Sequence, residues 1–203
     1  MNARNLVLAA SGLLAGALAA VLFFSPASQT TTSSETPVVS GKALVGGPFS
    51  LTDMTGKRVT DQDFLGHPML VFFGYTHCPD ICPSGLQVIS AALDKLGPKG
   101  QNVTPVFITL DGERDTPAKM ADYVKSFHPR LVGLTGTPQE IAAAAKAYRV
   151  FYQKISDEKS PGDYTFDHAA IIYLMGPDGK FITHIPHTTD VDQVVTVLNK
   201  SLS

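Results

Sequence analysis

The 203-residue sequence has little cysteine and no concentration of positive charge. It contains only two cysteines, and 16 Lys and Arg against 18 Asp and Glu give a formal net charge of -2. No long run of Lys or Arg occurs, which argues against a nucleic-acid partner, because such partners require a basic surface. A structural zinc site needs four ligands, often two cysteine pairs, and only one pair exists. No internal repeat is visible either, so a repeat architecture is excluded.

One long apolar run stands out at the N-terminus. Residues 6–24 read LVLAASGLLAGALAAVLFF, 19 residues without a charge. At about 1.5 Å per residue, a helix of this length matches the roughly 30 Å hydrocarbon core of a bilayer. Arg4 precedes the run and no Lys or Arg follows until Lys42, so the positive-inside rule places the rest of the chain outside the cytoplasm. We therefore expect residues 1–24 to form a membrane anchor.

A cleaved secretory signal is the alternative interpretation of this run. Ser25-Pro26-Ala27 offers small residues near a plausible cleavage site. The run is longer than the usual signal core of about 7 to 15 residues, which favours the uncleaved anchor. Both interpretations send the domain to the same side, so we expect a single-pass protein of the inner membrane whose domain faces the periplasm. Residues 25–47, rich in Ser, Thr, Pro and Gly, are predicted to be a flexible tether.

Residues 48–203 show the alternating pattern of a compact α/β domain. Apolar runs bounded by turn signals predict strands, and apolar residues three or four apart predict helices. The expected strands cover 69–73, 103–110, 131–134 and 150–155, with one hairpin over 49–60 and another of 169–175 with 181–185. The expected helices cover 86–96 and 141–148, and a further one begins at 117. A last helix is expected to be capped by Thr189 and Asp192. No clear element is predicted for 156–167. This order fits a thioredoxin-like fold with a central mixed sheet flanked by helices.

The cysteines lie in the segment GYTHCPDICP, residues 74–83, where a buried strand turns into a helix. Open α/β sheets place ligand sites at such switches. Pro83 suits the first helical turn, so Cys82 is expected near the helix N-terminus, whose partial positive charge favours a thiolate. Three residues separate the cysteines, one more than in a thioredoxin-type exchange motif. A structural disulfide, a redox pair and a metal site all remain open, and two soft sulfur ligands without further cysteines suit copper better than zinc.

His168 is the strongest candidate for a third ligand. It immediately precedes the apolar run 169–175, and if that strand lies antiparallel to the cysteine strand, its beginning meets the cysteines at one sheet edge. We expect His168 to occupy the loop before this strand. The other histidines are weaker candidates: His77, His184, His187, His67 and His128.

Three segments resemble the Sco/SenC family, which assists copper insertion into cytochrome c oxidase. These are GYTHCPDICP at 74–83, LDGERDTP at 110–117 and DHAAIIYLM at 167–175. The resemblance implies copper bound by Cys78, Cys82 and His168, with Asp111 in a nearby segment that affects the site. Spacing alone favours a plain loop for Asp111, Arg114 and Asp115. The sequence departs from the family at Gly112, where proline is common, and at Ala169, where serine is common.

The resemblance implies a metallochaperone and not an enzyme. Its cofactor would be a copper ion, as Cu(I) or Cu(II), and its main partner the copper-site subunit of cytochrome c oxidase, with a thioredoxin-like reductant and another copper carrier as further partners. A thiol-disulfide oxidoreductase using Cys78 and Cys82 as its redox-active pair is the alternative, because a thiolate at a helix N-terminus is also a good nucleophile. A peroxide-consuming enzyme is the third hypothesis, although no accompanying arginine and threonine are evident.

Overall fold

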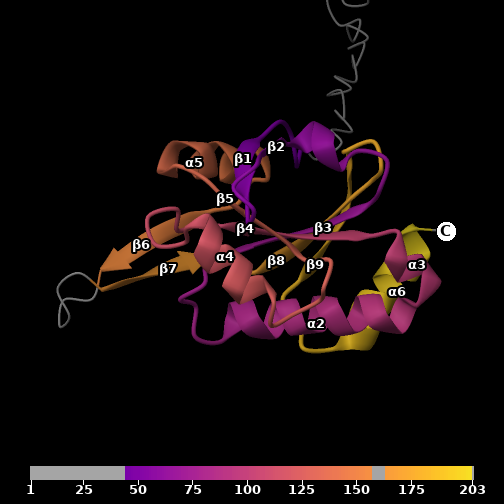
Figure 1. Ribbon diagram of the computed structural model, residues 1–203. Helices are drawn as coiled ribbons and strands as arrows, with labels where there is room; N and C mark the ends of the chain where they lie inside the picture. The colour runs from indigo at the N-terminus through magenta and orange to yellow at the C-terminus, as the bar shows by residue number, and fades with distance from the viewer. Residues whose placement is uncertain (1–43, 157–162, 203) are drawn as a thin grey trace, which may run out of the picture. The chain divides into compact units, whose positions relative to one another are not determined.

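The computed structural model describes residues 44–156 and 163–202, all of which belong to one compact unit, Gly41–Ser203 (Figure 1). The predicted anchor, residues 1–24, and most of the predicted tether, residues 25–47, lie outside the described residues. In the part that is described, no helix has the length and apolar character needed to cross a bilayer. Residues 44–47 adjoin the domain, since the Gly46 N–H donates a 3.0 Å hydrogen bond to the Ala147 carbonyl.

A mixed sheet of seven strands forms the centre of the described domain, in the order β2-β1-β5-β4-β3-β8-β9. The strands are β1 (Ser50–Asp53), β2 (Arg58–Thr60), β3 (Met69–Gly74), β4 (Thr104–Thr109), β5 (Val132–Thr135), β8 (Ile171–Met175) and β9 (Phe181–Pro186). β3, β4 and β5 run parallel, whereas β8 lies antiparallel to both β3 and β9. The predicted thioredoxin-like arrangement of a mixed sheet with parallel early strands and a late antiparallel hairpin is thereby confirmed.

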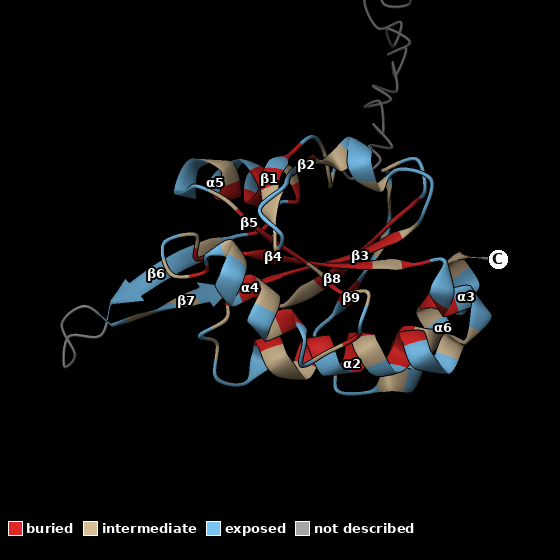
Figure 2. Cartoon of the chain, viewed as in Figure 1, coloured by how far each residue is buried: buried red, intermediate tan, exposed pale blue. Residues whose placement is uncertain are grey.

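Helices cover both faces of this sheet (Figure 1). Successive side chains of a strand point to opposite faces, so Leu70 and Phe72 of β3 join one buried cluster while Met69, Val71 and Phe73 join the other. The first cluster includes side chains from α2 (Ile81–Leu96), α4 (Pro117–Val124) and α6 (Val191–Ser201), and the second includes those of α5 (Pro138–Ala147). Figure 2 shows the buried residues concentrated in the central strands. A strand covered on both faces explains why 69–73 reads as a continuous apolar run.

Side-chain caps set where the helices begin. Thr137 and Glu140 form a capping box at the start of α5, and Thr116 accepts the Lys119 N–H at the start of α4. The predicted capping of the last helix by Thr189 and Asp192 was wrong. Asp190 is the N-cap, since its side chain accepts hydrogen bonds from the N–H groups of residues 192 and 193, and α6 begins at Val191. Two short elements went unpredicted, the 3-10 helix η1 (Asp61–Phe64) and α3 (Pro98–Gln101).

A separate two-stranded sheet carries the largest correction to the predicted fold. β6 (Tyr152–Ser156), close to the strand predicted over 150–155, pairs antiparallel with β7 (Tyr164–His168), most of which lies in the stretch 156–167 for which no clear element was predicted. In β7, Tyr164, Phe166 and His168 are half-buried and alternate with exposed residues, the period of a strand with one covered face. The polar residues before β7 hid this short alternation in the sequence. Figure 1 shows the β6–β7 hairpin extending away from the main sheet.

Candidate metal centre

Both cysteines lie where β3 leads into α2. Cys78 is in the connecting loop and Cys82 is the second residue of the helix. Pro83 follows within the first turn, where a backbone N–H needs no helical partner. The chain turns sharply at this point, with the Cys78 N–H donating to the Tyr75 carbonyl at 3.2 Å. The Cys82 N–H then donates to Cys78 Sγ at 3.4 Å, so local backbone geometry places the two sulfurs on the same side.

His168 reaches the cysteines from the end of β7. Its Nε2 lies 3.7 Å from Cys82 Sγ, and one ligand atom from each of Cys78, Cys82 and His168 lies within 4.8 Å of the others. β8 is antiparallel to the cysteine strand β3, as predicted. The expected loop position was wrong, however, because His168 is the last residue of β7 and pairs with Tyr152. The structure thus brings the three predicted residues together, although His168 belongs to the strand β7 and not to a loop before β8.

Both thiols are free, Cys78 half-buried and Cys82 buried, and their pKa values shift in opposite directions. A hydrogen bond from the Cys82 side chain, supported by one from His168, lowers the pKa of the Cys78 thiol to about 4. The pKa of Cys82 is raised, first because its thiol donates to Cys78 and second because it is buried with 0% exposure. The expectation of a thiolate at Cys82 was therefore wrong. Burial and the shared hydrogen bond outweigh the partial charge of the helix N-terminus, which contributes typically 0.3–1 kcal/mol.

This difference predicts the pH dependence of alkylation. The reaction of iodoacetamide with the reduced protein is expected to change little from about pH 6 to pH 9, because Cys78 is already a thiolate there. An ordinary thiol with a pKa near 8.5 gains about tenfold per pH unit below that value. Peptide mass spectrometry should find the label on Cys78, because Cys82 is buried. In Cys82→Ala the main cause of the lowered pKa is gone, so the rate should regain its pH dependence. A tenfold rise per pH unit in the unsubstituted protein would contradict the assignment.

Gly74, the last residue of β3, leaves the space that Cys82 occupies. A Cβ at this position would lie 2.6 Å from Cys82 Sγ and 2.9 Å from Cε2 of Phe107. Real Cβ atoms do not approach other heavy atoms this closely, so a side chain here requires Cys82 or Phe107 to move. In the sequence, Gly74 is only the residue that follows the apolar run 69–73. Its role could not be recognised before the position of the helix over the strand was known.

A buried polar loop lies beside the cysteines, between β4 and α4. Asp115 is fully buried and accepts the Thr76 N–H at 2.9 Å and the hydroxyls of Thr76 and Thr109 at 2.5 Å each. Asp111 is only 2% exposed and accepts hydrogen bonds from Arg114. The interpretation of this segment as a plain loop was wrong, because both carboxylates are buried and form hydrogen bonds. Thr76 connects the loop directly to the turn that carries Cys78.

The remaining histidines lie apart from the two sulfurs. His77 is half-exposed, and its Nδ1 is 3.9 Å from Asp115 Oδ1. His77, Asp111 and Asp115 form a second group of potential metal ligands, with one ligand atom of each within 4.8 Å of the others. Both carboxylates, however, already accept the hydrogen bonds described above. His128 is buried beside Asp94 at 3.6 Å, and His184 stacks on Phe181. His67 and His187 are exposed, and among the described residues only His168 is grouped with the cysteines.

The structure accounts for both departures from the family pattern. A Cβ at Gly112 would lie 2.2 Å from the Gly136 carbonyl oxygen, so the backbones at these two positions approach too closely for another residue. Ala169 is exposed, and its contact with His168 is made by its carbonyl oxygen, 3.3 Å from Nδ1. A carbonyl beside the non-coordinating nitrogen orients a histidine ligand. Since this oxygen belongs to the backbone, alanine can supply it as well as serine.

The fold and the site together define a thioredoxin-like domain with a candidate metal centre of two sulfurs and one imidazole. Residues 38–203 match the family model described as SCO1/SenC, and the chain belongs to this family. It is 47% identical over 163 residues to "Protein SCO1 homolog 1, mitochondrial" of Arabidopsis thaliana, covering 80% of this chain and 48% of that protein. It is 50% identical over 149 residues to "Protein SCO1 homolog, mitochondrial" of Homo sapiens, covering 71% and 48%. The chain therefore spans about half the length of these curated relatives.

Solved structures agree with the family assignment. The crystal structure of Arabidopsis thaliana ScoI with copper bound superposes with a TM-score of 0.74 at 45% identity, covering 78% of this chain and 98% of that one. The structure of Bradyrhizobium japonicum ScoI with copper bound gives 0.71 at 46% identity, covering 77% and 99%. At these identities the likeness extends beyond the general fold, and the predicted family resemblance is confirmed.

Proposed function

We propose that this protein binds one copper ion through Cys78, Cys82 and His168 and serves as a copper carrier in cytochrome c oxidase assembly. The convergence of two sulfurs and an imidazole nitrogen within 4.8 Å carries the proposal. Two thiolates are soft ligands suited to Cu(I), and an imidazole also suits copper. Two family members of 45% and 46% identity have solved structures with copper bound, which supports the same cargo here.

The unequal burial of the ligands suits a carrier that must release its ion. Cys82 is fully buried, whereas Cys78 and His168 are half-exposed. A target protein's ligands can therefore approach from the side of Cys78 and His168 and replace them one at a time. Cys82 holds the ion from beneath until the exchange is complete. The acceptor in this proposal is the dinuclear copper site of an oxidase subunit, which is the role that the family resemblance implies.

The proposed location is the periplasmic side of the inner membrane. The supporting observation is the uncharged run of residues 6–24, followed by a Ser-, Thr- and Pro-rich stretch. A domain held in this way would share the membrane of its oxidase target and would search a limited volume around its anchor. A thioredoxin-like reductant and another copper carrier complete the set of partners in the proposal.

Copper titration of the reduced protein tests this function. Without oxygen, the unsubstituted protein should bind one Cu(I), measured by competition with bicinchoninate. His168→Ala should lower the Cu(I) affinity by about 100-fold, more than the 10-fold minimum typical for loss of an outer contact to a metal ligand. His184→Ala is the matched control, an equally conservative change at a histidine outside the group, and should bind as the unsubstituted protein does. Full retention of affinity in His168→Ala would remove this residue from the ligand set.

One observation favours a second function, reduction of a target disulfide. The lowered pKa of Cys78 supplies a half-exposed thiolate, which can attack a disulfide and form a mixed disulfide. Cys82 would then lose its proton, attack the Cys78 sulfur and release the target as a dithiol, leaving Cys78 and Cys82 oxidised to a disulfide. Oxidase assembly in cells separates the two functions. A reductase should tolerate His168→Ala and fail with Cys78→Ser, whereas a copper carrier should fail with both.

A further inference from the structure

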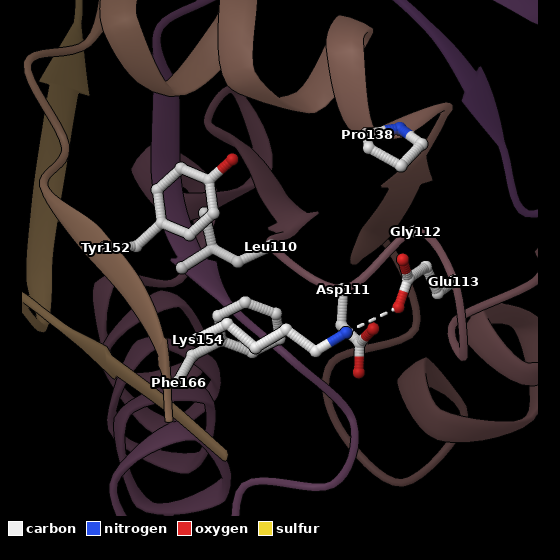
Figure 3. A pocket seen from close by; sticks show the side chains of 8 residues that line it. All are labelled: Leu110, Asp111, Gly112, Glu113, Pro138, Tyr152, Lys154 and Phe166. Atoms are coloured by element: carbon white, nitrogen blue, oxygen red, sulfur yellow. Dashed lines mark hydrogen bonds and ion pairs between the residues drawn. The ribbon is translucent and has the colours of Figure 1, made fainter. Parts of the chain in front are cut away.

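The strand that carries His168 is not part of the main sheet. Among the strands that the structure describes, β7 pairs only with β6, in a sheet of two strands. A two-stranded hairpin is marginally stable by itself, so its position depends on side-chain contacts with the rest of the domain. A cavity of about 200 Å³ also lies between this hairpin and the β4–α4 loop, lined in part by Leu110, Tyr152 and Phe166 (Figure 3). Close packing alone therefore does not hold the hairpin in place.

Tyr164, at the start of β7, contacts four charged groups. Two cations lie over its ring, with Arg114 Cζ 3.6 Å and Lys154 Nζ 3.7 Å from the ring centroid. Its hydroxyl donates to Asp111 Oδ1 at 2.7 Å and lies 3.3 Å from Glu113 Oε2. Lys154 also pairs with Glu113 at 2.7 Å, the contact drawn in Figure 3. This arrangement, which we call the Tyr164 clamp, joins the hairpin to the β4–α4 loop.

A continuous row of rings leads from the clamp to His168. Tyr164, Phe166 and His168 share one face of β7 because they are two residues apart. The ring centroids of Tyr164 and Phe166 are 5.7 Å apart, those of Phe166 and Tyr75 are 5.4 Å apart, and those of Tyr75 and His168 are 6.0 Å apart. Edge-to-face pairs at these distances each contribute about 0.5–1.5 kcal/mol beyond their burial. Displacement of Tyr164 would therefore disturb the packing that orients the imidazole.

The clamp also connects the hairpin to the turn that carries Cys78. Asp111, which accepts the Tyr164 hydroxyl, lies on the same short loop as Asp115, which bonds to both the N–H and the hydroxyl of Thr76. Thr76 is two residues before Cys78. The β4–α4 loop is therefore bonded on one side to the strand that carries His168 and on the other to the turn that carries Cys78.

We propose that Tyr164 is a positioning residue that holds His168 at ligand distance from Cys82. The inference rests on the proposed copper site and extends it to a residue that touches none of the three ligands in the contacts above. Tyr164 acts by fixing the hairpin against the β4–α4 loop, and its effect on copper binding passes through His168. Loss of the clamp should leave the two cysteines as they are and allow the imidazole to move.

Cu(I) competition measurements on the reduced full chain test this inference. Tyr164→Leu removes the ring and the hydroxyl and should weaken Cu(I) binding about tenfold, the size typical for loss of an outer contact that orients a ligand. Tyr164→Phe keeps the ring and its contacts with the two cations and should lose about threefold. Thr165→Ala, an exposed position in the same strand, is the control and should bind as the unsubstituted protein does. If Tyr164→Leu does not fold, Lys154→Met, which removes one cation, should still lose about threefold.

The decisive comparison is made in the His168→Ala background. There Tyr164→Leu should cause no further loss of affinity, because the ligand through which it acts is absent. An equal loss in both backgrounds would mean a general effect on the fold and would overturn the inference, as would an unchanged affinity of Tyr164→Leu alone. NMR of the metal-free protein gives an independent readout, since the His168 ring signals should shift or broaden in Tyr164→Leu and stay unchanged in Thr165→Ala. If the unsubstituted protein bound no Cu(I), the proposed function would fail, and the NMR comparison would still decide whether Tyr164 holds His168.

Discussion

Replacing Gly74 with alanine is expected to lower the free energy of unfolding by about 2–3 kcal/mol, the upper range for overpacking a well-packed core. The added Cβ would lie 2.6 Å from Cys82 Sγ and 2.9 Å from the Phe107 ring, and both are fully buried. The shorter of these contacts is with Cys82, so we expect this sulfur to move. Cu(I) binding should then weaken at least tenfold, by analogy with the loss of an outer contact that orients a metal ligand. Chemical denaturation and Cu(I) competition measure the two effects.

A double substitution separates the contact with sulfur from a general loss of packing. In Gly74→Ala/Cys82→Ala the close contact with Cys82 Sγ is gone, while the contact with the Phe107 ring remains. The stability lost in the double variant should therefore be smaller than the sum of the losses in the two single variants, by roughly 1 kcal/mol, within the range of coupling energies for residues in contact. Additive losses would mean that Gly74 does not limit the position of Cys82.

Asp115→Ala is expected to destabilise the domain by about 3 kcal/mol. The carboxylate is fully buried and accepts hydrogen bonds from the Thr76 N–H and from the hydroxyls of Thr76 and Thr109. Hydrogen bonds to a charged group contribute about 1.5–3 kcal/mol, and removing the acceptor leaves its buried donors without a partner. Asp115→Asn keeps one side-chain acceptor and should cost about half as much. Asp122→Ala, at an exposed carboxylate that pairs with Lys125, is the control and should change stability by less than about 0.5 kcal/mol.

Asp115→Ala should also change the reactivity of the cysteines, because Thr76, which donates to Asp115, is close to Cys78 in the chain. Without Asp115 the turn that follows β3 loses its connection to the β4–α4 loop. Iodoacetamide should then label Cys82 as well as Cys78 in Asp115→Ala, whereas Asp122→Ala should show label on Cys78 alone. Protection of Cys82 in a measurably destabilised Asp115→Ala would show that burial of this sulfur does not depend on the loop.

Much of the fold was predictable because its signals are local. The continuous apolar run of β3 and the end of α2 at Leu96 are each encoded within a few residues, and both occur where expected. The capping box Thr137 to Glu140 at the start of α5 is equally local. β7 was missed for the opposite reason. Its alternation covers only five residues, and the side chains that cover its inner face, such as Tyr75, come from a distant part of the chain.

The ligand set was predictable because the chemistry of the residues limits the choice. Cys78 and Cys82 are the only cysteines in the sequence, and His168 stands just before the strand β8, which lies antiparallel to β3. The protonation of the cysteines was not predictable. Helix position pointed to Cys82 as the thiolate, but Cys82 is fully buried and donates its hydrogen bond to the more exposed Cys78.

The sequence by itself determined which residue types meet at this site, because a four-residue spacing across a strand-to-helix turn places two sulfurs together through local geometry alone. It also determined the family, through three motifs in their proper order. Only the tertiary structure decided which sulfur carries the charge, why position 74 must be glycine, and how a separate hairpin holds His168 against Cys82. These properties depend on burial and on contacts between β3, the β4–α4 loop and β7, which are distant in the sequence and meet only after the chain has folded.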